Sequence, residues 1–170
     1  MKQKIYYIGA SILTILLVIL DQFTKYLAVV HLKDQASFVI IKDVFSLHYL
    51  ENTGAAFGLF KDQRLFFIIS TLTIVGAIIW FFIKMPKVKR YHPMILSATF
   101  VVAGALGNFI DRIRLGYVID FFYFELIDFP IFNVADCYIV VSLCILSFLL
   151  LFYYKEEDLA FLSWQKKEKV

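Results

Sequence analysis

The chain has 170 residues, of which 61% are apolar and 18% are charged. Soluble domains have roughly 45–50% apolar and about 25% charged residues, so this composition excludes a soluble domain and indicates an integral membrane protein. The formal net charge of +3 comes from Lys and Arg residues that are spread over several short loops, so no nucleic-acid partner is expected.

Four apolar runs predict an all-α integral membrane protein with four transmembrane helices in a single polytopic domain, residues 1–170. The approximate spans are residues 5–30, 65–83, 94–112 and 134–154, close to the ~20 residues that cross a bilayer as a helix. The third span is rich in Ala and Gly. Small residues let helix backbones approach closely in lipid, so this span is expected at the centre of the bundle.

The first apolar run resembles the start of a secretory signal peptide, but it has no A-x-A-like cleavage site and continues beyond Lys25. It therefore predicts a retained helix. Asp21 and Lys25 are four residues apart, so they share a helix face and can neutralise each other. Their position is consistent with an interfacial ion pair and equally with residues that orient a site or contact a substrate.

Residues 31–64, between the first two spans, predict a small β-rich cap. Phe45–Leu50 alternates as a half-buried strand does, Ser37–Ile41 is a second β-rich run, and Lys42 and Asp43 suit a turn between them. Asn52 is followed by Thr53 and Gly54. It is either a turn residue or an amide that bonds the backbone of a bound peptide.

The distribution of Lys and Arg predicts the orientation in the membrane. Ten of these residues lie in the N-terminus, the second loop and the tail, whereas six lie on the opposite side together with eight acidic residues. Because positive residues favour the cytoplasmic side, both termini are expected there, with the cap outside. The tail after residue 154 is expected to lie on the membrane surface.

Polar residues interrupt the apolar sequence between residues 104 and 136, and six of them are candidates for a site. Asn108, Asp111 and Arg112 share one side of the third span. They form either a buried Asp–Arg pair with a neighbouring amide or part of a functional site in which Arg112 favours a nearby carboxylate. The other three are Asp120, Asn133 and Asp136. Ionisable groups near a bilayer are costly and usually mark a pathway, a relay or an active site.

Asp120 and Asp136 are the candidate catalytic residues. Asp120 stands in an aromatic run with no neutralising neighbour, and its structural alternative is a partnered interface residue. Asp136 would be the third residue of a helix capped by Asn133, in a spacing similar to a capping box. Both are expected on the outer side. Two close carboxyl groups share a proton, so the pair can activate water.

The sequence contains no pattern typical of a metalloenzyme or a serine hydrolase, and two other functions are left as alternatives. His31, His48 and His92 are scattered without metal-ligand spacing, and no Gly-x-Ser-x-Gly motif occurs, so neither a metal nor a cofactor is expected. Intramembrane carboxylates with Lys25 and Arg112 could instead serve a small proton- or ion-relay transporter. The lack of an internal repeat is against it. A non-catalytic membrane scaffold is a third possibility.

Five motif blocks in this order resemble those of the lipoprotein signal peptidase family, signal peptidase II. The resemblance covers all four spans, and the blocks are Asp21-Gln-Phe-Thr-Lys25, Asn52-Thr-Gly54-Ala-Ala-Phe57, Gly104-Ala-Leu-Gly-Asn108-Phe-Ile-Asp111-Arg112, Val118-Ile-Asp120-Phe121 and Phe132-Asn133-Val-Ala135-Asp136. Ala103 stands where many members have Gly. Residues 122–132 match no usable motif.

The resemblance implies a bacterial cytoplasmic-membrane aspartic endopeptidase that cuts prolipoproteins just before a diacylglyceryl-modified cysteine. Asp120 and Asp136 would form the catalytic dyad at the outer face. The positions that would support or line the site are Asp21, Lys25, Asn52, Gly54, Asn108, Arg112, Asn133 and Ala135. The implied fold is four helices with a small extracytoplasmic sheet. Membrane lipid and globomycin-type peptide inhibitors are the other implied partners, and a monomer is expected.

Overall fold

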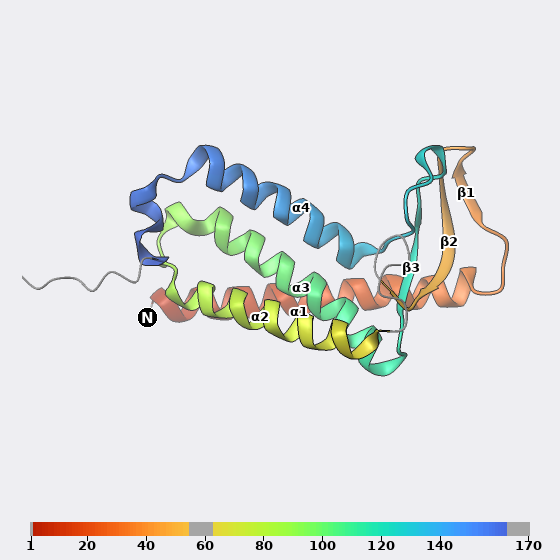
Figure 1. Ribbon diagram of the computed structural model, residues 1–170, viewed down its shortest axis with the longest axis horizontal. Helices are drawn as coiled ribbons and strands as arrows, with labels where there is room; N and C mark the ends of the chain where they lie inside the picture. Colours follow the sequence, from red (N-terminus) through yellow and green to blue (C-terminus); the bar gives the residue numbers. More distant parts are fainter. Residues whose placement is uncertain (1, 55–62, 163–170) are drawn as a thin grey trace, which may run out of the picture.

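Four long helices and a three-stranded sheet make up the part of the chain that is described, residues 2–54 and 63–162, in a computed structural model (Figure 1). The helices are α1 (Lys2–Leu32), α2 (Arg64–Lys84), α3 (His92–Arg114) and α4 (Val134–Phe148), and a π-helical turn, η4 (Leu149–Tyr153), continues α4. The helices form an elongated bundle, and the sheet stands across one end of it (Figure 1).

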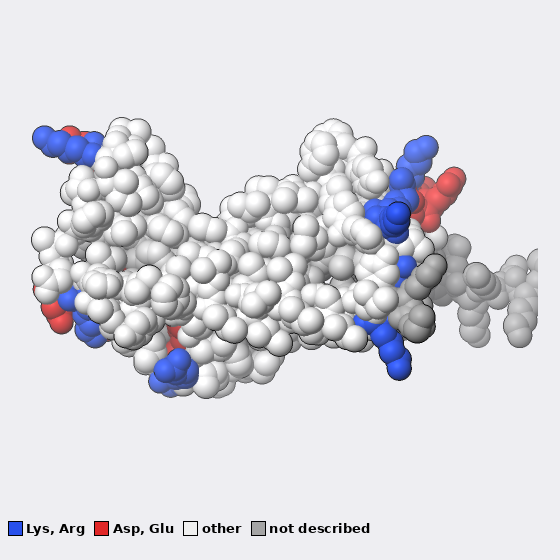
Figure 2. Space-filling view, turned by 180° about the vertical axis from the view of Figure 1, so that it is seen from behind, with Lys and Arg blue, Asp and Glu red and all other residues white. Residues whose placement is uncertain are grey.

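All four helices are long and apolar enough to cross a membrane, over Lys4–Leu32, Arg64–Lys84, Lys89–Arg114 and Val134–Tyr153. Large apolar side chains such as Ile15, Ile69 and Val140 are more than half exposed on their surfaces, which suits contact with lipid. On the face shown in Figure 2, the charged side chains of the described residues gather toward the two ends, with an uncharged belt between them. These features fit a multi-span membrane protein.

The third predicted span, α3, is the centre of the bundle, as its small residues indicated. Helices α1, α2 and α4 all pack against it. A Cβ atom on Gly104 would lie 2.8 Å from Cγ1 of Ile139 and would collide with the carbonyl of Ala135. A Cβ atom on Gly107 would collide with the carboxylate of Asp21. Both glycines are therefore required for close approach of α1 and α4 to α3.

The sheet begins with the hairpin that the sequence predicted between the first two spans. Its strands are β1 (Phe38–Ile41) and β2 (Phe45–Asn52), which pair antiparallel. In the turn, Asp43 has a φ of 58°, a left-handed conformation that Asp adopts more readily than most residues. The N–H of Val44 donates to the carbonyl of Ile41 at 3.0 Å and closes the turn.

A third strand corrects the prediction that the β-rich cap is confined to residues 31–64. Strand β3 (Val118–Tyr123) comes from the segment after α3 and pairs antiparallel with β2, with Leu50 opposite Asp120. Its first four residues are all buried. Because a strand buried on both faces reads as a continuous apolar run, its sequence does not show the alternation that identified β2. The sheet thus places Asp120 at the end of the bundle.

The opposite end of the bundle is joined by aromatic and charged contacts. The rings of Tyr91 and Tyr154 stack with centroids 5.6 Å apart, and Arg90 pairs with Asp158 at 2.6 Å. Asp158 belongs to the short helix η5 (Glu156–Leu162), which ends the described chain. The tail predicted to lie on the membrane surface extends from there into residues 163–170, outside the described ranges.

Candidate active site

Asp120 lies within β3 and is 2% exposed. The side-chain amide of Asn133 donates to its Oδ1 at 2.6 Å, and that of Asn52 donates to its Oδ2 at 2.8 Å. Burial and the negative charge of Asp136 raise the pKa of Asp120 to about 7, against the opposing effects of the two amides and of Lys25. Asp120 therefore exchanges a proton near neutral pH.

Asp136 is the third residue of α4 and forms a capping box with Asn133, as the sequence indicated. The N–H of Asp136 donates to Oδ1 of Asn133 at 3.0 Å, and the N–H of Asn133 donates to Oδ2 of Asp136 at 3.1 Å. Nδ2 of Asn108 donates to the other carboxylate oxygen at 2.8 Å. The side chain of Asp136 is therefore fixed by two hydrogen bonds, and its backbone N–H makes a third.

Asn133 joins the two aspartates. It is fully buried, and its side-chain Nδ2 bonds Asp120 while its backbone N–H bonds Asp136. The same Nδ2 lies 3.1 Å from Oδ1 of Asn108 and 3.3 Å from the carbonyl of Ile119. One residue at the start of α4 thus holds the carboxyl group of β3 and that of α4 in a fixed relation.

A buried ion cluster supports this arrangement from behind. Nζ of Lys25 lies 3.0 Å from Asp21 and 2.9 Å from Asp111, and none of these side chains is more than 3% exposed. The predicted neutralisation of Asp21 by Lys25 is confirmed. Lys25 also donates to Oδ1 of Asn108 at 2.8 Å, and Asp21 accepts the N–H of Ala135 at 3.0 Å. The cluster therefore connects α1 to both α3 and α4.

Asp111 does not form the buried pair with Arg112 that was one of the two alternatives left open by the sequence. Asp111 pairs with Lys25 and accepts a hydrogen bond from Gln22 at 2.9 Å, instead of pairing with Arg112. Adjacent residues on a helix do not face each other, so a pair between neighbours is disfavoured. Gln22 also donates to the carbonyl of Gly107. It is part of the cluster, and sequence reasoning gave it no role.

Arg112 connects α3 to the end of β2. Its Nη2 donates to the carbonyl of Gly54 at 3.1 Å, and its guanidinium lies 4.4 Å from the ring centroid of Phe67 on α2. Oδ1 of Asn52 accepts the N–H of Gly54 at 2.9 Å, so the turn role considered for Asn52 is confirmed. The side-chain nitrogen of Asn52, Nδ2, donates to Asp120. The rest of this motif, residues 55–57, lies outside the described ranges.

A cavity of about 500 Å³ lies beside both aspartates. Its polar wall consists of Asn52, Gly54, Asn108, Arg112, Asp120 and Asp136. Its apolar wall includes Val140 and Val141 of α4, which are 60% and 57% exposed. The cavity therefore extends from the carboxyl groups to the outer surface of the bundle, where a membrane-embedded molecule has access.

Of the other residues expected at the site, Asn133 lies between the two carboxyl groups, and three form part of the support behind the cavity wall. These three are Asp21, Lys25 and Ala135. Sequence reasoning missed the wall formed by residues 129–132, because residues 129–131 match no motif and Phe132, the first residue of the last block, was given no role. The N–H groups of Phe121 and Phe122 both donate to the carbonyl of Phe132, which brings the segment against β3.

The arrangement is suited to acid–base chemistry. Two carboxyl groups that face one cavity and interact cannot both ionise readily, so they titrate as a pair and share a proton. One can accept a proton from water while the other donates one to a carbonyl oxygen. Among the described residues, no group of three or more His, Cys, Asp or Glu side chains is placed to hold a metal ion.

Comparison with known proteins agrees with this geometry. A family model described as signal peptidase (SPase) II matches residues 13–152. A lipoprotein signal peptidase of Caldanaerobacter subterraneus subsp. tengcongensis is 44% identical over 144 residues, which are 84% of this chain and 96% of the relative. A lipoprotein signal peptidase of Streptococcus pyogenes is 38% identical over 158 residues, or 93% of this chain and 98% of that protein.

Solved structures have the same fold. A bacterial membrane enzyme determined by the in meso method at 2.3 Å resolution superposes with a TM-score of 0.73 at 31% identity, covering 95% of this chain and 94% of its own. A second, determined by the same method at 1.9 Å, has a TM-score of 0.72 at 32% identity and covers 86% of this chain and 94% of its own.

Proposed function

This chain belongs to the signal peptidase II family, and from that premise we propose that it is a membrane aspartic endopeptidase that removes signal peptides from prolipoproteins. Asp120 and Asp136 form the catalytic dyad. The observation that carries the assignment is that Asn133 bonds both carboxyl groups beside one cavity. The cut falls just before a cysteine that carries a diacylglyceryl group.

The two aspartates have different roles at the start of the reaction. Asp120, whose pKa is raised to about 7, carries the shared proton. Asp136 is the ionised partner, since it accepts two hydrogen bonds at the N-terminal end of α4, where negative charge is favourable. The sequence alone does not decide which aspartate is protonated at rest, so this assignment is part of the proposal.

Hydrolysis then follows from these protonation states. Asp136 takes a proton from water as the water oxygen attacks the scissile carbonyl carbon, and Asp120 gives its proton to the carbonyl oxygen. When the C–N bond breaks, Asp136 passes its proton to the leaving amine, and Asp120 recovers a proton from the hydroxyl that becomes part of the new carboxyl group. The dyad ends in its starting state.

The position of the cavity suits a lipid-modified substrate. Its polar wall includes Asn52 of β2 and Asp120 of β3, and its apolar wall reaches the exposed face of α4 at Val140 and Val141. Acyl chains can remain in lipid along α4 while the peptide bond meets the dyad. Arg112 and Asn52 offer the polar contacts for the peptide backbone.

The membrane arrangement is part of the same proposal. The whole chain forms one membrane domain with both termini in the cytoplasm, and the sheet and the dyad lie at the outer face of the bacterial cytoplasmic membrane. The protein acts as a monomer and requires neither a metal nor a cofactor. Globomycin-type peptides inhibit it by occupying the cavity beside the dyad.

The test is cleavage of a defined precursor by the purified protein in proteoliposomes. A precursor with a diacylglyceryl-modified cysteine should be cut just before that cysteine, as determined by mass spectrometry of the products. The same precursor without the lipid, or with Ser in place of the cysteine, should be cut far more slowly. Equal cleavage of all three precursors would contradict the proposed specificity.

A further inference from the structure

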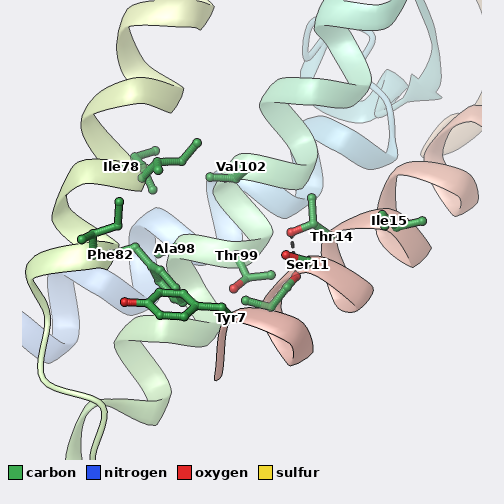
Figure 3. Close-up of a pocket in the computed structure, with 12 residues that line it drawn as sticks. Tyr7, Ser11, Thr14, Ile15, Ile78, Phe82, Ala98, Thr99 and Val102 are labelled. Atoms are coloured by element: carbon green, nitrogen blue, oxygen red, sulfur yellow. Dashed lines mark hydrogen bonds between the residues drawn. The ribbon is translucent and has the colours of Figure 1, made fainter. Parts of the chain in front are cut away.

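A second cavity lies in the half of the bundle far from the sheet, between α1 and α2 (Figure 3). It has a volume of about 680 Å³. Helices α1 and α2 both pack on α3, whose Ala98, Thr99 and Val102 form the floor of the groove. Along α1 the groove extends from Tyr7 to Ile15, about 12 Å at 1.5 Å per residue. One leaflet is about half of the ~30 Å hydrocarbon core, so the groove spans most of the thickness of a leaflet.

The lining of this groove suits an apolar chain. Its walls are formed largely by Ile and Phe side chains of α2 and by small residues of α1. The hydroxyl groups of Thr14 and Thr99 donate to the carbonyls of Ala10 and Ile95, at 2.9 and 2.8 Å. These hydroxyl donors are already used within their own helices. An apolar groove of this kind is unfavourable for water, so a hydrocarbon chain is the occupant that its surface matches.

A cation stands at one end of the groove. Nζ of Lys87 lies 5.3 Å from the ring centroid of Tyr7 and 4.6 Å from that of Phe82, and both rings line the groove. The ammonium donates to the carbonyls of Met85, at 2.6 Å, and Phe82, which leaves one of its three donors. Within residues 2–54 and 63–162, no carboxylate forms an ion pair with Lys87.

Partial burial without an anion is unfavourable for a Lys side chain. Desolvation lowers the pKa of Lys87. Lys84 and Lys89, on either side of it in sequence, add positive charge. This local charge disfavours the Lys- and Arg-bearing start of a signal peptide as the occupant and favours an anionic headgroup.

We propose that this groove binds one acyl chain of an anionic phospholipid, with the phosphate of the lipid at the ammonium of Lys87. The site is separate from the cavity beside Asp120 and Asp136, and the proposal does not depend on which reaction the protein catalyses. It assigns a lipid of defined charge to a fixed position in the leaflet that meets the N-terminal end of α1.

Native mass spectrometry of the purified protein tests the proposal. Titration with phosphatidylglycerol and with phosphatidylcholine of the same acyl chains should show preferential retention of phosphatidylglycerol. Lys87→Gln should weaken this retention about fivefold, as expected for one Lys near an anionic headgroup. Lys89→Gln, which removes the same charge two residues away, is the matched control and should have a smaller effect.

A second pair of variants tests the position of the chain. Ser11→Phe places a ring in the groove from an exposed position on α1, so it should reduce retention of phosphatidylglycerol, whereas Ser11→Ala should not. Cleavage of a lipid-modified precursor should keep the same KM in both variants. A raised KM in Ser11→Phe would assign the groove to the precursor and would overturn the proposal.

Three other results would also overturn it. These are equal retention of the two phospholipids, equal effects of Lys87→Gln and Lys89→Gln, and displacement of phosphatidylglycerol by an equal concentration of inorganic phosphate. The last would show a site for the phosphate group without the acyl chain. If Ser11→Phe fails to fold, as judged by circular dichroism, the comparison of the two Lys variants still decides the outcome.

Discussion

The ammonium of Lys25 lies 2.8 Å from Oδ1 of Asn108, and this contact determines which amide atom Asn108 presents to Asp136. A Lys side chain has donors and no acceptor, so it fixes the orientation of the amide. Nδ2 of Asn108 then faces Asp136 at 2.8 Å. A buried charge on α1 thus sets the hydrogen bond that α3 gives to an aspartate on α4.

Replacing Lys25 with Met should destabilise the protein strongly. The change leaves Asp21 and Asp111 buried without their cation, and breaking a buried ion pair in this way costs about 3–5 kcal/mol. We expect a large fall in the thermal unfolding midpoint, measured in one detergent, and loss of activity because Asn108 is released from its fixed orientation.

Lys33→Met is the matched control for this prediction. Lys33 and Glu51 form an ion pair of 2.8 Å, but their side chains are 41% and 38% exposed. Exposed pairs contribute little because water screens them. The unfolding midpoint should stay nearly unchanged. Similar losses in Lys25→Met and Lys33→Met would contradict the role given to the buried cluster.

Gly104→Ala should destabilise the contact between α3 and α4. The added Cβ would collide with the carbonyl of Ala135, which belongs to the backbone and cannot rotate away, and would lie 2.8 Å from Ile139. Overpacking of this kind costs about 1–3 kcal/mol. Thermal unfolding measures the loss, and because Ala135 is next to Asp136, activity should fall as well.

Gly76→Ala on α2 is the corresponding control. A Cβ atom there meets nothing within 4 Å. Since Ala favours a helix over Gly by up to about 1 kcal/mol, this variant should be neutral or slightly more stable. The explanation by close packing fails if both substitutions lower the unfolding midpoint equally.

Much of this architecture could be predicted from local patterns. The four apolar runs, the β1–β2 hairpin, the pairing of Asp21 with Lys25 and the cap formed by Asn133 all depend on spacing within one segment. The central position of α3 followed from its small residues. In the hairpin, the ion pair and the cap, the residues in contact are close in sequence.

The contacts that escaped prediction join distant segments. Strand β3 pairs with β2 across about 70 residues, and its buried residues lack the alternation of a half-exposed strand. Asp111 has Lys25 as its partner, 86 positions earlier, and Gln22 bonds it from the same helix α1. Residues 129–132 line the cavity through a bridge between Phe122 and Phe132. Tertiary packing determines such pairs, and a single sequence does not show it.

Activity should decrease as pH rises through about 7. The raised pKa of Asp120 means that the folded protein keeps this proton up to neutral pH, and the proposed mechanism requires the proton. The same shift affects stability. The contribution of neutral Asp120 is fully present below its ordinary pKa near 3.8 and is lost as pH rises through about 7. The Asp120→Asn variant should lack this dependence of unfolding on pH.

Asn52→Ala should move the alkaline limb of the activity profile to higher pH. The amide of Asn52 donates to Asp120 at 2.8 Å and lowers its pKa, so removing the amide raises the pKa further. The measurement is kcat/KM against pH with a lipid-modified precursor peptide. Thr53→Ala, which changes the next residue and keeps the amide, should leave the limb in place. A shift to lower pH in Asn52→Ala would contradict the proposed protonation of Asp120.

The most direct test of the account is turnover of one diacylglyceryl-modified precursor by Asp120→Asn and Asp136→Asn. Both substitutions keep the size of the side chain and remove its acid–base function, so each should reduce kcat by a factor of about 10² to 10⁴. Asp128→Asn makes the same change at a residue that bonds the exposed Tyr123 hydroxyl and should retain activity. Substantial turnover by either dyad variant, in folded and inserted protein, would contradict the assignment of Asp120 and Asp136 as the catalytic pair.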